Sequence, residues 1–277
     1  MYAHRIALGG LSLAVWDFVF LCGVTAGYFV LRATLRVAGF QRPRALAVRW
    51  LVTVYVSVVG AQLFAYAFDV NASLLPPAST SWLRYYLDPL GGPKTLYGAI
   101  VALPLGVAAA TLPWRDVPYR SALDCWTPPL MSVLAVARLG CFLQGCCYGV
   151  RSDWFGMSFP AGSPAYQAQV RAGEIVAGAA SHPVVPTQAL SFIVLLLLAV
   201  WCYGRVREAR RHVFFDGIAL YSVARFGIEI VRADPERNAY GPFSTSQWIA
   251  IGILGAYVLG RLSEWGASAP TRSGFRR

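Results

Sequence analysis

The chain has 277 residues, of which 57% are apolar and only 13% are charged, and its mean hydropathy is +0.51. Soluble domains carry roughly 25% charged residues, so this composition excludes an ordinary soluble domain and indicates an integral membrane protein. A net charge of +11 would suggest nucleic acid as the partner of a soluble protein. Here the basic residues lie in short gaps between apolar segments, where they act as topology signals, and we expect no nucleic-acid partner.

Seven apolar segments are long enough to cross a hydrocarbon core of roughly 30 Å. We expect the first to be retained as a span, because no small-residue cleavage site accompanies it. Pro104, Pro128 and Pro129 interrupt the third and fourth segments. The sequence therefore predicts an all-α, polytopic fold and a single transmembrane domain over residues 1–277, with spans near 11–31, 50–69, 95–112, 121–142, 187–204, 214–231 and 246–263.

Lysine and arginine residues are distributed unevenly between the two sets of connecting segments. With the N-terminus outside, fifteen of the 24 fall on the cytoplasmic side, seven fall outside, and Arg138 and Arg225 lie within spans. Because basic loops stay cytoplasmic, this asymmetry favours an outer N-terminus and a cytoplasmic C-terminus. The outer segments near 70–94 and 143–186 are too long for simple turns, and their aromatic residues and prolines suit lids or interfacial segments.

The stretch YSVARFGIEIVRADPER places Arg225, Glu229 and Arg232 at spacings of four and three, on one helical face. A charge inside a membrane helix costs roughly 2.5–3.5 kcal/mol on insertion scales, so these side chains must face a partner or a polar cavity. One interpretation is a structural ion pair that locks two helices. The other is an anion site near the outer face, because Arg138 adds to the positive excess and guanidinium groups bind a phospholipid phosphate in bidentate fashion.

Three cysteines, Cys141, Cys146 and Cys147, follow Arg138 at the end of the fourth span and allow three interpretations. A zinc site would need a fourth ligand, for which His182 is available, but the spacing matches no common zinc pattern. A disulfide is compatible with an oxidising outer compartment. The third interpretation is three small, adaptable side chains that pack at a helix end. We assign no metal ligand and no cofactor from the sequence, and all three interpretations stay open.

Five stretches follow one another in the order of a known family. The run RLGCFLQGCCYG at 138–149 is similar to a signature Gly-Arg-Ile-Gly-Asn-Phe-Ile-Asn-Gly-Glu, followed by two residues and Gly. GGPKTLYGAI, VPTQALS, RFGIEIVRADPE and FSTSQWIAI are similar to the loop before helix three, a His-Pro-Ser/Thr-Gln motif, an Arg-Phe-x-x-Glu-x-x-Arg motif and a Ser-x-x-Gln motif. Together they resemble the bacterial prolipoprotein diacylglyceryl transferase family over nearly the whole chain.

The resemblance implies transfer of the diacylglyceryl group of phosphatidylglycerol to the lipobox cysteine of a prolipoprotein, which makes a thioether and releases glycerol phosphate. The implied partners are phosphatidylglycerol, membrane lipid and a prolipoprotein signal peptide, in the cytoplasmic (inner) membrane of a bacterium. Arg138 and Arg225 would contact the lipid phosphate, Glu229 would orient them, and Tyr97 would complete the catalytic set. The implied substrate-binding residues are Trp16, Cys141, Cys146, Gly149, Gln188, Arg232 and Gln247.

The chain departs from the family pattern at several of these positions. Tyr97 and Val185 replace histidines, Cys141 and Cys146 replace Asn and Glu, and Trp16 replaces Tyr. A tyrosine of reference pKa about 10 is a poor general base, but a thiol of reference pKa about 8.5 is partly ionised unaided, so base catalysis is the function most easily lost. The replacements motivate two alternatives, a non-catalytic lipid- or lipoprotein-binding protein of the same fold and an outer-face thiol or metal protein that uses the three cysteines.

Overall fold

The computed structural model of the chain describes residues 5–8, 11–40, 44–68, 81, 85, 87–89, 92–113, 115–234 and 239–268. Within these ranges the fold is mostly helical, with α1 (Val15–Val37), α2 (Leu46–Ala67), α4 (Leu96–Thr111), α5 (Tyr119–Gln144), α6 (Pro164–Arg171), α7 (Thr187–Arg207), α8 (Val213–Ile230) and α9 (Thr245–Ser268). Two antiparallel hairpins join β1 (Arg5–Leu8) to β2 (Leu11–Ala14) and β3 (Ala239–Tyr240) to β4 (Phe243–Ser244).

Each predicted span coincides with a helix, and the differences lie at the ends and in the connections. The start of the first predicted span, residues 11–14, forms β2 instead. The sequence did not predict the two hairpins or the short helix α6. Because of the hairpins, the fold is mostly but not entirely α-helical. Among the described helices, α1, α2, α5 and α7 are long and apolar enough to cross a membrane, and α4 is a shorter apolar helix. The chain is thus a polytopic membrane protein, while the count of seven spans and their orientation stay predictions.

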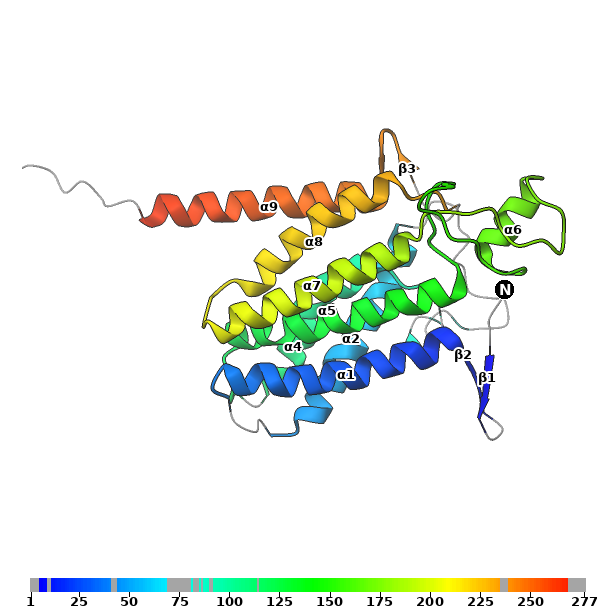
Figure 1. Cartoon of the computed structure of the whole chain (residues 1–277). Coiled ribbons are helices and arrows are strands. Elements are labelled where there is room, and N and C mark those ends of the chain that lie inside the picture. The colour runs from blue at the N-terminus through cyan, green and yellow to red at the C-terminus, as the bar shows by residue number, and fades with distance from the viewer. Residues whose placement is uncertain are drawn as a thin grey trace, which may run out of the picture.

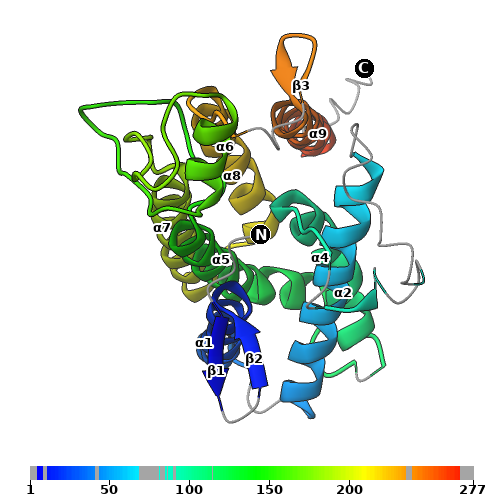
Figure 2. The same cartoon turned by 90° about the vertical axis from the view of Figure 1, so that its right-hand side faces the viewer.

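Helix α5 lies at the centre of the packing and contacts α1 and α7, while α2 packs on α4 and α8 packs on α9. Figures 1 and 2 show α1 and α9 on opposite sides of the bundle. Small residues allow the close approach of the helices. A Cβ atom at Gly27 of α1 would lie 2.7 Å from side-chain atoms of Trp50 and Val133, so a larger residue would separate α1 from α2 and α5.

A partly buried ion pair joins α2 to the connection between α4 and α5. Arg49 is 0% exposed, and its Nη1 and Nη2 atoms lie 2.6 and 2.9 Å from Oδ1 and Oδ2 of Asp116. The hydrogen bonds from Arg49 lower the pKa of the Asp116 carboxyl group. The pair therefore fixes the end of the bundle at which α2 and α5 begin.

The opposite end carries α6 and both hairpins, as Figure 1 shows. It is the end at which α5 and α8 finish and α7 and α9 begin. The segments that follow α5, precede α7 and follow α8 are joined there by main-chain hydrogen bonds. The N–H of Gly149 donates to Val185 O at 2.8 Å, and the N–H of Val150 donates to Val231 O at 2.8 Å. This pairing holds the chain ends of α5, α7 and α8 in one place.

A second small core covers this end of the bundle. It consists of Tyr148, Phe159, Ala165 and Val184, and Phe142 and Ala168 pack against it. Helix α6 within it begins at Ser163, whose side chain accepts a hydrogen bond from the N–H of Tyr166 at 3.3 Å. The segment 143–186 is therefore a packed cap, whereas the predicted outer segment 70–94 lies mostly outside the described residues.

Candidate active site

Arg138 is a buried cation near the end of α5. The residue is only 5% exposed, and its Nε atom is buried without a hydrogen-bond partner among the described residues. Within that same part of the chain no carboxylate forms an ion pair with it. A buried charge without a counter-charge is strongly unfavourable, so the site is suited to an anion that is supplied from outside the chain.

Arg225 and Arg232 are arranged differently, because acidic side chains accompany them. Arg225 Nη2 lies 2.5 Å from Glu229 Oε2 and 3.3 Å from the Ser246 hydroxyl at the start of α9. Arg232 follows the end of α8, with Nη1 3.8 Å from the same Glu229 oxygen. Its other side-chain nitrogens form a bidentate pair with Asp234, and Nη2 lies 2.8 Å from Oδ2.

This network combines the two interpretations of the charged face. Glu229 and Asp234 match two arginines, as expected for a structural ion-pair network, and Arg138 supplies the surplus positive charge. The resemblance implies that Glu229 orients Arg138 and Arg225, and in the structure Glu229 forms ion pairs with Arg225 and Arg232. The sequence reasoning missed Asp234, although it follows Arg232 by only two residues.

Tyr97, near the start of α4, faces α8. Its ring packs edge-on against Tyr221, with ring centroids 5.5 Å apart and planes at 65°. The hydroxyls of Tyr97, Tyr221 and Ser222 are buried without a hydrogen-bond partner of acceptable geometry among the described residues, although Tyr97 lies beside Ser222. Buried polar atoms normally have hydrogen-bond partners, so these three hydroxyls are suited to binding a polar ligand. Tyr221 and Ser222 precede Arg225 by four and three residues, and that helical spacing could have predicted them.

The three cysteines meet beside Arg138. Cys141 lies on α5 one turn beyond Arg138, and the chain then turns back through Gly145, whose φ is +69°. The Sγ atoms of Cys141, Cys146 and Cys147 all lie within 4.8 Å of one another. His182, considered above as a fourth zinc ligand, is not part of this group, and its ring nitrogen lies 3.3 Å from the Glu174 carbonyl instead.

The loop that carries Cys146 and Cys147 is held by the first turn of α7. Gln188 Nε2 donates to Cys146 O at 2.5 Å, and the Thr187 hydroxyl donates to Cys147 O. Cys147 has a φ of +58°, a conformation that only strong surrounding contacts maintain in a residue with a side chain. Hydrogen bonds from the Cys141 and Cys146 thiols lower the pKa of the Cys147 thiol, and nearby guanidinium groups act in the same direction. The loop is therefore built to hold its thiols in place.

Trp16 lies next to the signature segment, where Lys94 also approaches. A Cβ atom at Gly140 would lie 2.9 Å from the Trp16 ring, so the ring packs directly on α5. Lys94 Nζ lies 5.3 Å from the centroid of the same ring. Burial lowers the pKa of Lys94, and Asp17 and Asp88 act against that change. Trp16 thus joins α1 to the site by packing.

Three other predicted substrate-binding residues have structural contacts in the same region. Gly149 has no room for a side chain, because a Cβ atom would lie 2.5 Å from Val231 O. Gln188 holds the cysteine loop, and its Oε1 is buried without a partner among the described residues. Gln247 caps α9, since its Oε1 accepts from the Ser244 N–H at 2.9 Å. Their contact with a substrate stays a prediction.

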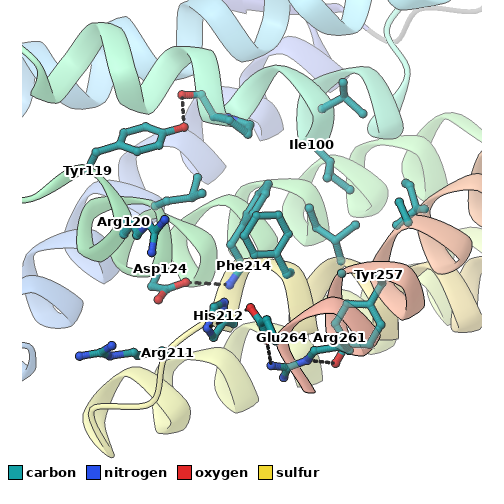
Figure 3. Close-up of a pocket in the computed structure, with 18 of the residues that line it drawn as sticks. Ile100, Tyr119, Arg120, Asp124, Arg211, His212, Phe214, Tyr257, Arg261 and Glu264 are labelled. Atoms are coloured by element: carbon teal, nitrogen blue, oxygen red, sulfur yellow. Dashed lines mark hydrogen bonds and ion pairs between the residues drawn. The ribbon is translucent and has the colours of Figure 1, made fainter. Parts of the chain in front are cut away.

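A cavity lies elsewhere in the bundle. It has a volume of about 930 Å³ and lies between α4, α5, α8 and α9. Figure 3 shows its lining, with apolar residues such as Ile100 and Phe214 and with charged residues, Arg120, Arg211 and Arg261 among them. None of the predicted site residues lines it, and it occupies the end at which α5 and α8 begin. The predicted site residues therefore lie outside this cavity.

Comparison with known proteins identifies the family. Residues 4–261 match the family described as prolipoprotein diacylglyceryl transferase. Phosphatidylglycerol-prolipoprotein diacylglyceryl transferase 2 of Clostridium perfringens is 33% identical over 187 residues, which cover 63% of this chain and 66% of that protein. The transferase of Clostridium tetani is 27% identical over 259 residues, or 91% and 94% of the two chains, and that of Dehalococcoides mccartyi (strain 195) is 28% identical over 193 residues, or 66% and 68%. The chain belongs to the prolipoprotein diacylglyceryl transferase family.

Proposed function

We propose that the protein transfers the diacylglyceryl group of phosphatidylglycerol to the thiol of a prolipoprotein lipobox cysteine, at the outer face of a bacterial cytoplasmic membrane. The observation that carries this proposal is Arg138, a buried guanidinium group without an acidic partner among the described residues. Family membership supplies the reaction class. Arg138 supports an anion site, and the phosphate of the lipid is an anion that a guanidinium group binds well.

The phosphate of phosphatidylglycerol would contact both Arg138 and Arg225. Guanidinium groups bind phosphate oxygens with two parallel hydrogen bonds, and the pairing of Arg225 with Glu229 fixes one of the two groups in place. The unsatisfied hydroxyls of Tyr97, Tyr221 and Ser222 offer hydrogen bonds to the glycerol headgroup. The buried polar atoms that lack partners in the protein would then find them in the lipid.

The cavity between α4, α5, α8 and α9 offers a place for the acyl chains. Its lining begins at Ile100 and Ile218, each one helical turn from Tyr97 and Tyr221. A lipid whose headgroup contacts the two tyrosines could therefore extend its tails along the bundle. Burial of acyl methylene groups stabilises binding by about 0.8 kcal/mol for each CH₂ group removed from water.

The chemical step needs stabilisation of a leaving phosphate more than it needs a strong base. The acceptor sulfur, as a thiolate, forms a bond to the glyceryl carbon next to the phosphate. The carbon–oxygen bond breaks, and its electron pair leaves with glycerol phosphate, which gains one negative charge. Arg138 and Arg225 would stabilise this charge as it develops, in a site that excludes most water.

The test is a transfer assay with purified protein, phosphatidylglycerol and a lipobox peptide. We expect a peptide product whose mass increases by one diacylglyceryl group, and glycerol phosphate in equal amount. A peptide with serine in place of the lipobox cysteine is the matched control and should give no product. A relative that is competent in the same assay runs in parallel.

Two variants separate transfer from binding. Arg138→Ala should lose transfer, whereas Arg171→Ala, which removes an exposed arginine of α6, should retain it. Lipid that copurifies with the wild-type protein, without any product while the relative is active, would overturn the proposal in favour of a non-catalytic lipid-binding protein. The replacement of the family histidine by Tyr97 makes that outcome a real alternative.

A further inference from the structure

We propose that Cys141, Cys146 and Cys147 form a three-thiolate site for a zinc ion, and that its open fourth position binds the thiol of the acceptor cysteine. The second half of this inference rests on the proposed function, whereas the first half does not. The spacing of the three cysteines matches no common metal pattern, because the ligands come from a helix end and from a tight turn.

The geometry of the three sulfur atoms fits the ion. They lie within 4.8 Å of one another, and zinc–sulfur bonds of about 2.3 Å at tetrahedral angles would hold them about 3.8 Å apart. Rotation of the side chains would have to bring the sulfur atoms closer together. Thr187 and Gln188 hold the main chain of the loop through the carbonyls of Cys147 and Cys146. Such support from the surroundings is typical of metal sites.

The local charge selects a divalent ion. Three thiolates and Zn²⁺ carry one net negative charge, and the guanidinium group of Arg138 lies close to the Cys141 and Cys147 thiols. With Cu⁺, another ion that favours thiolate ligands, two negative charges would remain against the same arginine. Zinc therefore leaves less negative charge in this partly buried loop than Cu⁺ would.

The fourth position is open within the described residues. No fourth His, Cys, Asp or Glu ligand atom joins the three sulfurs there, and all three cysteines are partly exposed. Catalytic zinc sites keep such a position for water or substrate, and zinc deprotonates a coordinated thiol. An acceptor thiol would displace water, release its proton to solvent and remain as a thiolate beside Arg138. The ion would thus replace the base that Tyr97 does not provide.

The first experiment measures the metal itself. The full-length protein is purified in detergent under reducing conditions, stripped with chelator and reloaded with Zn²⁺ or Co²⁺. We expect one ion per chain and thiolate-to-cobalt charge-transfer absorption in the wild-type protein. Cys146→Ser should lose at least nine-tenths of the bound ion, whereas Cys22→Ser, which removes an exposed thiol of α1, should bind as the wild type does.

These measurements have clear contrary outcomes. Less than one ion in ten chains, with no charge-transfer band, would overturn the site even if the variants fold poorly, because the readout is taken on the wild-type protein. A disulfide between two of the three cysteines in the freshly reduced and reloaded protein would overturn it too. Mass mapping of alkylated thiols identifies such a disulfide directly.

The second experiment adds the lipobox peptide to the cobalt-loaded protein. A thiol that enters the fourth position should increase the charge-transfer absorption by about one third, because a fourth cobalt–sulfur bond joins three, and the serine peptide should not. If the cysteine peptide leaves the spectrum unchanged while transfer proceeds, the acceptor role is wrong and the proposed function stands. If the spectrum changes but no transfer occurs, the proposed function fails and the metal inference stands.

Discussion

Two arginines are buried in the same bundle, and they differ in whether an acidic side chain neutralises their charge. Arg49, near the start of α2, is 0% exposed and is held in bidentate fashion by Asp116. Arg138, near the end of α5, is 5% exposed, and no acidic side chain in the described part of the chain pairs with it. The two residues lie at opposite ends of the bundle, since α5 ends where the cap packs and α2 begins at the other end.

The difference separates a structural charge from a functional one. A buried cation with a geometrically matched carboxylate has its charge neutralised inside the protein and needs no anionic ligand. A buried cation without such a partner is costly, so its retention indicates that a ligand completes it. Burial alone would not distinguish Arg49 from Arg138. The partner is what distinguishes them, and each prediction below changes a partner or a charge.

Arg138→Ala should have the largest effect on activity. Loss of one group that stabilises a leaving charge typically lowers turnover by about 10²–10³-fold, and we expect at least that loss here. The thermal unfolding midpoint in detergent should stay the same or rise, because the substitution removes an unpaired buried charge. The transfer assay and a thermal melt of the same preparation measure the two effects. A fall in the midpoint that accounts for the lost activity would contradict the functional assignment.

Glu229→Gln should damage activity and stability together. It leaves Arg225 without its buried carboxylate, and breaking such a pair costs up to about 3–5 kcal/mol. We expect a clearly lower unfolding midpoint and a loss of turnover of about 10²-fold, because Arg225 would lose its fixed position. The Arg225→Met/Glu229→Leu double variant is the control. It should recover most of the stability and none of the activity, so recovery of both would exclude a role for Arg225.

Asp116→Asn should affect stability alone. It leaves Arg49 buried without a carboxylate, and we expect a cost of about 1–3 kcal/mol, below the usual value for a buried pair because Asp116 is one-third exposed. Transfer per folded molecule should not change.

The pH dependence of the same variant has a definite sign. The folded-state pKa of Asp116 is lowered, so its contribution is present above the unfolded pKa of about 3.9 and is lost as pH falls through the folded value. The difference in unfolding midpoint between the wild type and the variant should therefore be full at neutral pH and should shrink in acid below about pH 4. A difference that is constant across this range would contradict the ion-pair account.

The helices that could be predicted are those that each correspond to one long apolar segment of the sequence. The seven predicted spans match α1, α2, α4, α5, α7, α8 and α9 because membrane helices need long apolar segments. Strand β2 lies within the first predicted span, because four residues are too few to separate it from the apolar run that follows. Helix α6 has eight residues, and its Ser163-Pro164 start was the available signal.

Contacts between charged residues of one helix could be predicted from the sequence. Contacts between residues that are distant in the sequence could not. The spacing of Arg225, Glu229 and Arg232 is local, so periodicity could predict their contact. Arg49 and Asp116 are 67 residues apart, and nothing in either segment indicates the other. The meeting of the three cysteine sulfurs depends on the turn at Gly145 and on support from α7, neither of which spacing alone reveals.

Tyr97→Phe should have the smallest effect on transfer activity. It measures how much activity remains when Arg138 is present and the Tyr97 hydroxyl is absent. The phenol is buried beside Tyr221 and has a reference pKa of about 10, so it cannot accept a proton from a thiol at neutral pH. General base catalysis contributes about 10²–10⁴-fold where it operates, so a loss of less than about threefold would assign Tyr97 to headgroup contact only. Tyr97→His is the matched comparison, because it restores an imidazole at that position. If Tyr97→Phe instead lost 10²-fold or more, the hydroxyl would act in the chemical step, and the stabilisation by Arg138 would not be sufficient by itself.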